Sequence, residues 1–313
     1  MDTEENPAAR ASGGPTPLDQ LAFQNPVTRF DVPPGEGSQP PGSEGAQEVG
    51  AQIDCGEFTY RGTGRLTGRK ALITGGNSGI GAAVAIAFAR EGADVAVNYL
   101  PGEDENAQWI KGVIEAAGRK AVLLPGDLSD RRTCEELPQR AVDGLGGIDI
   151  LVNNAGMQVA CDSLEDLSDE QFTATFTLNI IGMYRVTRAA LPHLSAGSSI
   201  INTTSRQAYT PVISALDYAS TKGAINNFTK GLAQQLAPRG IRVNCVAPGP
   251  IFTTLTFSGA VPEKDLPTFG HNSPMGRAGQ PTEVAPAYVF LASPESSYVV
   301  GETLNVNGGF PTP

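Results

Sequence analysis

The chain is short of the residues that build metal sites and disulfide frameworks. Its 313 residues include four cysteines and two histidines, and none of them pairs at the short spacing that zinc ligands use. The residues concerned are Cys55, Cys134, Cys161, Cys245, His193 and His271. We therefore expect no metal site and interpret the cysteines as reduced, mostly buried thiols.

Long apolar runs and a basic leader are also missing. No stretch approaches eighteen consecutive apolar residues, as a membrane-spanning helix would require. The first residues, MDTEENPAAR, lack the basic and apolar regions of a secretory signal, so we expect a cytoplasmic protein with no membrane partner. Basic residues are outnumbered 22 to 33 by acidic ones, and the net charge of −11 argues against nucleic acid as a partner.

The first 60 residues lack apolar periodicity and hold eight of the 24 prolines, together with a net charge of −8. Such a composition does not bury enough apolar surface to offset the entropy of ordering the chain. We interpret residues 1–60 as an extended or disordered acidic arm and residues 61–313 as one folded domain. The aromatic residues of the arm are Phe23, Phe30, Phe58 and Tyr60. We hypothesise that they dock the arm across a subunit interface.

From Lys70 onward, short apolar segments alternate with amphipathic ones. The segments expected as strands are KALIT, ADVAVNY, KAVLLPGD, IDILVNN, SSIINTTS, IRVNCVAP and ETLNVNGG. The segments expected as helices are AAVAIAFAREG and residues 104–117, 130–144, 169–193 and 216–237. This alternation predicts βαβ units and a parallel sheet covered on both faces. The expected fold is α/β, a Rossmann-type doubly wound parallel sheet in three layers, forming a single domain with an extended N-terminal arm.

A glycine-rich turn, TGGNSGIG (74–81), joins the first strand to the first helix. Glycines allow the backbone to turn tightly and to approach a pyrophosphate, and the helix N-terminus offers free N–H groups with a partial positive charge. The strand–turn–helix context favours a dinucleotide-binding site over an ordinary turn. The residues assigned to it are Gly75, Asn77, Ser78, Gly79, Ile80 and Gly81.

Two later strand ends are expected at the same crevice, because ligands of such sheets bind beyond the carboxyl ends of the strands. Asp127 and Leu128 follow the third strand, where a carboxylate can accept a hydrogen bond from an adenine amino group. Asn153, Ala155 and Gly156 end the fourth. Each segment, taken singly, is equally consistent with a plain turn.

The segment after the second strand does not decide between NAD and NADP. NAD enzymes usually place an acidic residue there to bind the ribose diol, and NADP enzymes place a basic one. This chain has Asn98 and Tyr99, which are neither. Glu103 and its acidic neighbours would repel a 2′-phosphate if they faced inward, but they also suit the start of the next helix. Both cofactors are left open.

Tyr218 and Lys222 lie four residues apart near the start of an expected helix and therefore share one face. Ser205 ends the preceding strand. A phenol titrates near pH ~10, too high for an acid or base working near neutrality, and a nearby ammonium lowers that pKa. Ser205 can orient a substrate carbonyl, and Lys222 can hold ribose hydroxyls. The group predicts an NAD(P)-dependent oxidoreductase that interconverts an alcohol and an aldehyde or ketone by hydride transfer, with Tyr218 as the acid/base.

Together these motifs resemble the short-chain dehydrogenase/reductase family over about residues 65–310. The resemblance rests on TGGNSGIG, NNAG (153–156), Ser205, the Tyr218-x-x-x-Lys222 pair and Pro248-Gly249. It implies that Asn179 completes a catalytic tetrad by holding a water that relays protons to Lys222. The arm is similar to that of a bacterial aldehyde-reductase-like subgroup with N-terminal extensions.

The resemblance also implies how substrate and subunits are held. Pro248, Gly249, Ile251 and Thr253 are expected at the nicotinamide end of the cofactor. Residues 254–275 are expected to form a mobile loop over the substrate. Its apolar residues, with no evident charged anchor, favour a small neutral or hydrophobic carbonyl or alcohol. A homotetramer is expected, built on the two long helices and the last strand.

Three alternative functions fit these residues less well. An enoyl-thioester reductase spaces its tyrosine and lysine seven apart, which would place tyrosine at position 215, where this chain has Ala215. A 3-oxoacyl carrier-protein reductase should show a basic patch for its acidic carrier, whereas this chain is acidic. A catalytically silent dinucleotide-binding regulator or scaffold typically loses the tyrosine or the lysine, and both are present here.

Overall fold

The computed structural model describes residues 53–312. Their seven strands form one sheet in the order β3-β2-β1-β4-β5-β6-β7. The strands are β1 (Lys70–Ile73), β2 (Asp94–Tyr99), β3 (Ala121–Pro125), β4 (Ile150–Asn153), β5 (Ser199–Thr203), β6 (Arg242–Pro248) and β7 (Thr303–Val306). Every neighbouring pair is parallel. The strand order reverses between β1 and β4, which is the switch point where such sheets bind ligands.

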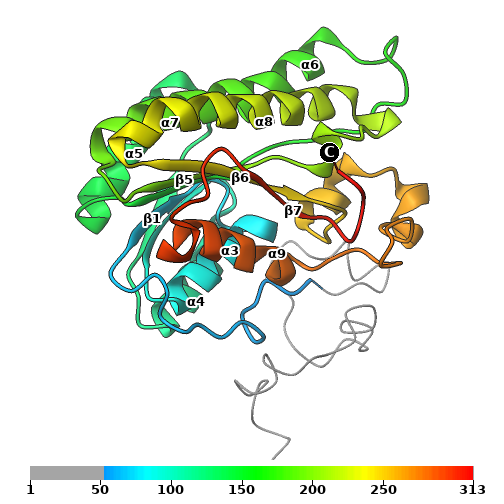
Figure 1. Ribbon diagram of the computed structural model, residues 1–313. Coiled ribbons are helices and arrows are strands. Elements are labelled where there is room, and N and C mark those ends of the chain that lie inside the picture. The colour runs from blue at the N-terminus through cyan, green and yellow to red at the C-terminus, as the bar shows by residue number, and fades with distance from the viewer. Residues whose placement is uncertain (1–52, 313) are drawn as a thin grey trace, which may run out of the picture.

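Helices cover both faces of the sheet, so the expected three-layer α/β fold is confirmed (Figure 1). The helices are α3 (Gly79–Arg90), α4 (Asp104–Ala116), α5 (Arg131–Leu145), α6 (Asp169–Phe176), α7 (Met183–Ala190), α8 (Leu216–Leu236) and α9 (Pro281–Ala292). Helices α3, α4 and α9 lie on one side of the sheet, and α5, α7 and α8 lie on the other (Figure 1). None of the helices in the described part of the chain is both long and apolar enough to cross a membrane.

Two helical regions differ in detail from the sequence-based expectation. The long helix expected over 169–193 is interrupted between α6 and α7 by a π-helical turn, Thr177–Gly182. Helix α9 was not expected at all. Its sequence, PTEVAPAYVFLA, is apolar around most of its circumference and contains Pro286, so no amphipathic period marks it. A capping box formed by Gln280 and Glu283 starts it.

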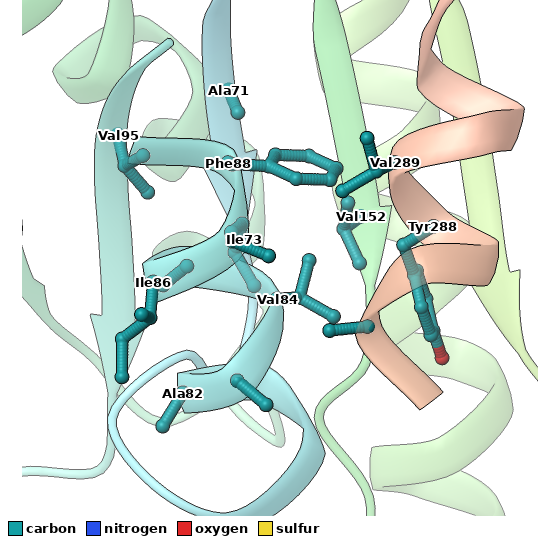
Figure 2. Packing of buried hydrophobic residues seen from close by; sticks show 14 of the residues in the cluster. Ala71, Ile73, Ala82, Val84, Ile86, Phe88, Val95, Val152, Tyr288 and Val289 are labelled. Carbon is teal, nitrogen blue, oxygen red and sulfur yellow. The ribbon is translucent and has the colours of Figure 1, made fainter. Parts of the chain in front are cut away.

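The core under one face of the sheet is built by α3 packing against both the strands and α9. Small side chains in GIGAAVAIAFAR let α3 approach closely, and ten of its twelve residues are buried. Figure 2 shows Phe88 of α3 directed toward Val289 of α9, with Tyr288 beside them. The Tyr288 hydroxyl lies 2.7 Å from the Thr203 hydroxyl at the end of β5. This core therefore extends to the carboxyl end of β5.

Residues 53–69 pack against the same core rather than extending away from it. Ile53, Cys55, Tyr60 and Leu66 are all buried with α3 and α9. The Cys55 thiol donates to the carbonyl of Gly79, in the glycine-rich turn, at 3.7 Å. The aromatic ring of Tyr60 therefore packs within its own chain and needs no partner subunit to bury it. The ring of Phe58, in contrast, is 54% exposed.

The other two aromatic residues of the arm, Phe23 and Phe30, lie outside the described residues. The hypothesis that the arm docks across a subunit interface therefore stays a prediction.

Candidate active site

A cleft of about 1360 Å³ opens at the carboxyl ends of the strands. Its lining comes from the glycine-rich turn, the ends of β2 to β6, the start of α8 and the segment between β6 and α9. The predicted site residues that line it are Gly75, Asn77, Ser78, Gly79, Ile80, Asn98, Tyr99, Asp127, Leu128, Ala155, Gly156, Ser205, Tyr218, Lys222, Pro248, Gly249, Ile251 and Thr253. Segments far apart in the sequence thus meet at one site.

Three predicted residues lie behind this lining. Gly81 sits in the first turn of α3, where an added Cβ would stand 2.0 Å from the Gly75 carbonyl oxygen. Asn153 is buried and its amide donates to Thr187 and Asn202. Asn179 is 1% exposed. Gly81 and Asn153 therefore support the wall of the cleft and do not touch its interior.

The glycine-rich turn forms a backbone-lined cradle. Gly75 and Gly79 have positive φ angles of 58° and 51°, which L side chains rarely adopt. A Cβ on Gly75 would stand 3.0 Å from the Cα of Ala155. Ser78 precedes α3 without a side-chain capping hydrogen bond, so the first N–H groups of the helix lack that partner. This is the environment that a pyrophosphate prefers, and the residues present therefore fit a dinucleotide.

At the end of the cleft formed by β2 and the glycine-rich turn, Glu103 faces inward. Its carboxylate accepts a hydrogen bond from the Asn77 side chain at 2.7 Å, and both residues line the cleft. Asn98 is turned toward β3, where its amide donates to the carbonyls of Leu124 and Gly126. The acidic group at this end of the cleft therefore comes from the start of α4, and not from the end of β2.

Tyr218 and Lys222 come together on α8 as their spacing predicted. The Lys222 Nζ lies 5.1 Å from the centroid of the Tyr218 ring and donates to the Thr203 carbonyl at 2.9 Å. Ser205 lines the cleft beside this pair and interacts with the Tyr218 side chain, and its hydroxyl accepts from the backbone N–H of Gln207 at 3.1 Å. A hydroxyl, a phenol and an ammonium therefore converge at the end of β5.

Burial shifts the pKa values of both Tyr218 and Lys222. Burial raises the pKa of Tyr218 to about 12, and the interaction with Ser205 offsets this only in part. Burial lowers the pKa of Lys222 to about 8. Both shifts favour the neutral forms, because removal from water penalises charge. In the protein without cofactor, burial therefore dominates the pKa of both side chains.

Asn179 lies beside these groups, inside the π-helical turn. Its Oδ1 accepts from the Met157 N–H at 2.9 Å, and its Nδ2 donates to the Thr221 hydroxyl at 3.1 Å. A second cavity of about 10 Å³ is lined in part by Asn179, Asn153 and Thr203. That is about the room one water needs, and the buried Asn153 Oδ1 has no hydrogen-bond partner in the described part of the chain.

The segment after β6 covers the other end of the cleft. Within residues 254–275, expected as a loop, two short helical turns form at Thr256–Ala260 and Glu263–Thr268. The Phe252 ring lies 6.2 Å from that of Phe257 and 5.6 Å from that of Phe269. Sequence reasoning identified this apolar cover.

Sequence reasoning missed Arg206, which lines the same cleft. Its place next to Ser205 was the available signal.

Comparisons with known proteins agree with this geometry. The family model described as "Enoyl-(Acyl carrier protein) reductase" matches residues 75–311. An uncharacterised oxidoreductase of Bacillus subtilis, YhxD, is 53% identical over 293 residues, covering 92% of this chain and 97% of the relative. The chloroplastic NADPH-dependent aldehyde reductase 1 of Arabidopsis thaliana is 45% identical over 275 residues, covering 86% of this chain and 94% of the relative.

A solved structure shares the fold. A short-chain dehydrogenase from Burkholderia cenocepacia, crystallised in complex with NADP, superimposes with a TM-score of 0.72 at 37% identity, covering 78% of this chain and 98% of the other. The site and these relatives define a Rossmann-type oxidoreductase. The chain belongs to the short-chain dehydrogenase/reductase family.

Proposed function

We propose that this oxidoreductase interconverts an alcohol and an aldehyde or ketone with NAD or NADP as its cofactor, using Tyr218 as the acid/base. The observation that carries the proposal is the meeting of Tyr218, Lys222 and Ser205 in the same cleft as the glycine-rich cradle. The bound nicotinamide would supply or accept a hydride at the substrate carbon. The protein then has to handle one proton and hold the carbonyl.

Each of the three side chains has a distinct task in carbonyl reduction. The Tyr218 hydroxyl, kept protonated by burial, donates its proton to the substrate oxygen. The Ser205 hydroxyl holds that oxygen in place. The Lys222 ammonium stabilises the phenolate left on Tyr218 and holds ribose hydroxyls of the cofactor. Alcohol oxidation reverses the transfer, and Tyr218 then accepts the proton.

Reprotonation of Tyr218 requires a path from the buried site to water. Lys222 is 3% exposed, so the path passes through other groups. The water-sized cavity beside Asn179 and Asn153 is suited to it, because the free Asn153 Oδ1 offers an acceptor for a water held there. We propose that Asn179 helps to hold this water and completes a tetrad with Ser205, Tyr218 and Lys222.

The test is nicotinamide absorbance with aldehydes and ketones, using NADH and NADPH in parallel. Tyr218→Phe removes the hydroxyl group and keeps the aromatic ring. We expect kcat to fall by about 10²–10⁴-fold, as for loss of a general acid. Dinucleotide binding should stay within threefold of wild type. Tyr298→Phe, at a fully exposed position (101%), is the matched control. Turnover by wild type that Tyr218→Phe leaves intact would reject the mechanism.

A second reading, reduction of an enoyl thioester, is favoured by the description of the matching family model. Position 215 holds Ala215, which is buried and offers no hydroxyl. A crotonyl thioester added to the same panel separates the two readings, because its reduction would consume NAD(P)H without any aldehyde or ketone. Dinucleotide binding with no turnover of any substrate would point to a regulator or scaffold instead.

We also propose that the protein is a homotetramer. The helices expected at its interfaces, α6 to α8, expose several large apolar side chains. These are Phe172, Ile181, Tyr184 and Leu216, which are 38–45% exposed. Apolar groups on the outer face of a helix layer favour contact with another subunit. The mass in solution, measured by light scattering, tests this assembly.

A further inference from the structure

The cleft holds one more cation than the proposed chemistry uses. Arg206 follows Ser205 directly and opens a short helical turn, Arg206–Ala208, at the end of β5. It lines the cleft together with Ser205 and Tyr218. Consecutive Cα atoms are about 3.8 Å apart, so this guanidinium is attached next to the hydroxyl proposed to hold the substrate carbonyl.

The Arg206 guanidinium has no carboxylate at salt-bridge distance within residues 53–312, unlike Arg65, Arg119 and Arg277. Its recorded partner is the ring of Phe310, whose centroid lies 4.2 Å from the Arg206 Cζ. The Asn307 side chain donates to the Phe310 carbonyl at 2.8 Å, which holds the backbone of Phe310 just beyond the end of β7. An aromatic face holds a guanidinium in place but leaves its N–H groups available.

No acidic side chain elsewhere in the cleft lining forms an ion pair with Arg206 either. The acidic residues of the lining are Glu103, Asp127 and Asp265. Glu103 and Asp127 follow β2 and β3, at the opposite end, and Asp265 lies on the covering segment without an ion pair to Arg206. Desolvation lowers the pKa of Arg206, with no opposing contribution from a counter-charge. A half-buried, permanently charged guanidinium without an anion is a ready receptor for one.

We propose that Arg206 binds an oxyanion of the substrate, so that the protein acts on aldehydes or ketones carrying a carboxylate or phosphate a few atoms from the carbonyl. This deepens the proposed function and rests on it. The apolar cover alone favoured a neutral substrate. Arg206, supplied from the end of β5, changes that expectation to an amphipathic molecule with one anionic end.

The test compares each anionic substrate with a neutral partner of the same carbon skeleton. For the carboxylate arm the pair is 4-oxobutanoate and its methyl ester, and for the phosphate arm it is glyceraldehyde 3-phosphate and glyceraldehyde. Wild type is expected to show at least a tenfold higher kcat/KM for the anion in one arm. That arm identifies the oxyanion. Arg206→Gln should abolish the preference through KM while leaving the neutral partner within twofold, and Arg206→Lys should keep part of it.

The control is Arg132→Gln, which removes the same charge from a side chain that is 84% exposed on α5. A wild type without preference in either arm would overturn the proposal. So would an Arg206→Gln variant that loses the anion and its neutral partner equally, because Arg206 would then only shape the site.

Binding measured without turnover separates this proposal from the function it rests on. Calorimetry would titrate 4-hydroxybutanoate, its methyl ester, glycerol 3-phosphate and glycerol into protein saturated with reduced dinucleotide. Tighter binding of an anion than of its neutral partner by wild type, lost in Arg206→Gln, supports the anion site even if no aldehyde is turned over. Equal binding of both partners in both pairs contradicts it even if neutral aldehydes are good substrates.

Discussion

The Asn77 side chain donates a hydrogen bond to the Glu103 carboxylate across the end of the cleft formed by β2 and the glycine-rich turn, at 2.7 Å. Glu103 starts α4, whereas NAD enzymes usually place the acidic residue that binds the adenosine ribose after the second strand. Here that position is held by Asn98, whose side-chain amide donates hydrogen bonds to the carbonyls of Leu124 and Gly126. The hydrogen bond from Asn77 therefore holds the Glu103 carboxylate at this end of the cleft. The residues at the end of β2 do not predict an acidic group there.

This pair should influence the choice between NADH and NADPH. A 2′-phosphate adds negative charge beside Glu103, and two like charges a few ångströms apart repel by about 1 kcal/mol even in water. Glu103→Gln removes the repulsion and keeps the side-chain shape. We expect the ratio of kcat/KM for NADPH to that for NADH to rise about tenfold, measured with one aldehyde at fixed ionic strength.

The control for this change is Glu105→Gln, on the same first turn of α4 but outside the cleft lining. It should leave the ratio unchanged. An equal rise in both variants would mean that general surface charge, and not the position of Glu103, governs the choice.

Dinucleotide binding should weaken as the pH rises above about 8. Burial lowers the pKa of Lys222 to about 8, so the protein without cofactor loses the ammonium above that pH. If the anionic dinucleotide binds the charged form more tightly, its apparent Kd rises above this pKa, by at most tenfold per pH unit. Fluorescence titration of the reduced cofactor between pH 6.5 and 9.5 measures it.

Lys222→Met should bind more weakly at pH 7 and show a flat profile above pH 8. Lys111→Met, at a half-exposed position on α4, should retain the wild-type profile. A wild-type Kd that stays constant through pH 9.5 would show that the Lys222 charge does not contribute to cofactor binding.

Local patterns predicted the sheet and the meeting of Tyr218 with Lys222 well, because the information lies in short segments. KALI followed by GGNSGIG defines a strand and a turn within a dozen residues, and Tyr218 and Lys222 share one helix face. Helix α9 was missed because its apolar residues cover most of its faces and its sequence contains Pro286, a residue that usually breaks helices. Arg206 and Glu103 were visible as residues, but the direction of their side chains depends on Phe310 and Asn77, which are distant in sequence.

A buried carboxylate fastens the segment before β1 to the end of α3, and this attachment was also beyond sequence reasoning. The side chain of Glu91 is fully buried. It accepts hydrogen bonds from the Tyr60 hydroxyl at 2.7 Å, the Arg65 guanidinium at 2.7 Å and the Thr63 N–H at 2.8 Å. Its partners lie 26 to 31 residues earlier in the chain. Burial alone would raise the pKa of Glu91, but these bonds together outweigh it and lower the pKa from 4.5 to about 2.

Replacing this carboxylate should make the protein less stable in a pH-dependent way. Because the folded-state pKa of Glu91 is depressed, its contribution is fully present above pH 4.5 and is lost as the pH falls toward 2. The shift corresponds to about 3 kcal/mol at neutral pH. We expect Glu91→Gln to lower the free energy of unfolding by that amount at pH 7 and by progressively less below pH 4.5.

Urea unfolding followed by the fluorescence of Trp109, which packs against the core that contains α3, provides the measurement. Glu115→Gln, with a side chain 49% exposed, is the control and should behave as wild type. A difference between Glu91→Gln and wild type that does not shrink in acid would show that shape, not charge, is what Glu91 contributes.

Two glycine-to-alanine changes inside helices should have opposite effects. At Gly81, in the first turn of α3, a new Cβ would meet the Gly75 carbonyl oxygen at 2.0 Å, so the glycine-rich turn or the helix must move. Overpacking of this kind costs about 1–3 kcal/mol. The displaced turn should also raise the Kd for dinucleotide by at least tenfold.

At Gly112, on the exposed side of α4, a Cβ meets nothing within 4 Å, and alanine should stabilise the helix by about 0.5–1 kcal/mol without changing dinucleotide binding. Thermal unfolding and cofactor titration of both variants check the pair. If Gly81→Ala binds dinucleotide as tightly as wild type, the close approach of α3 to the turn is not what shapes the cradle.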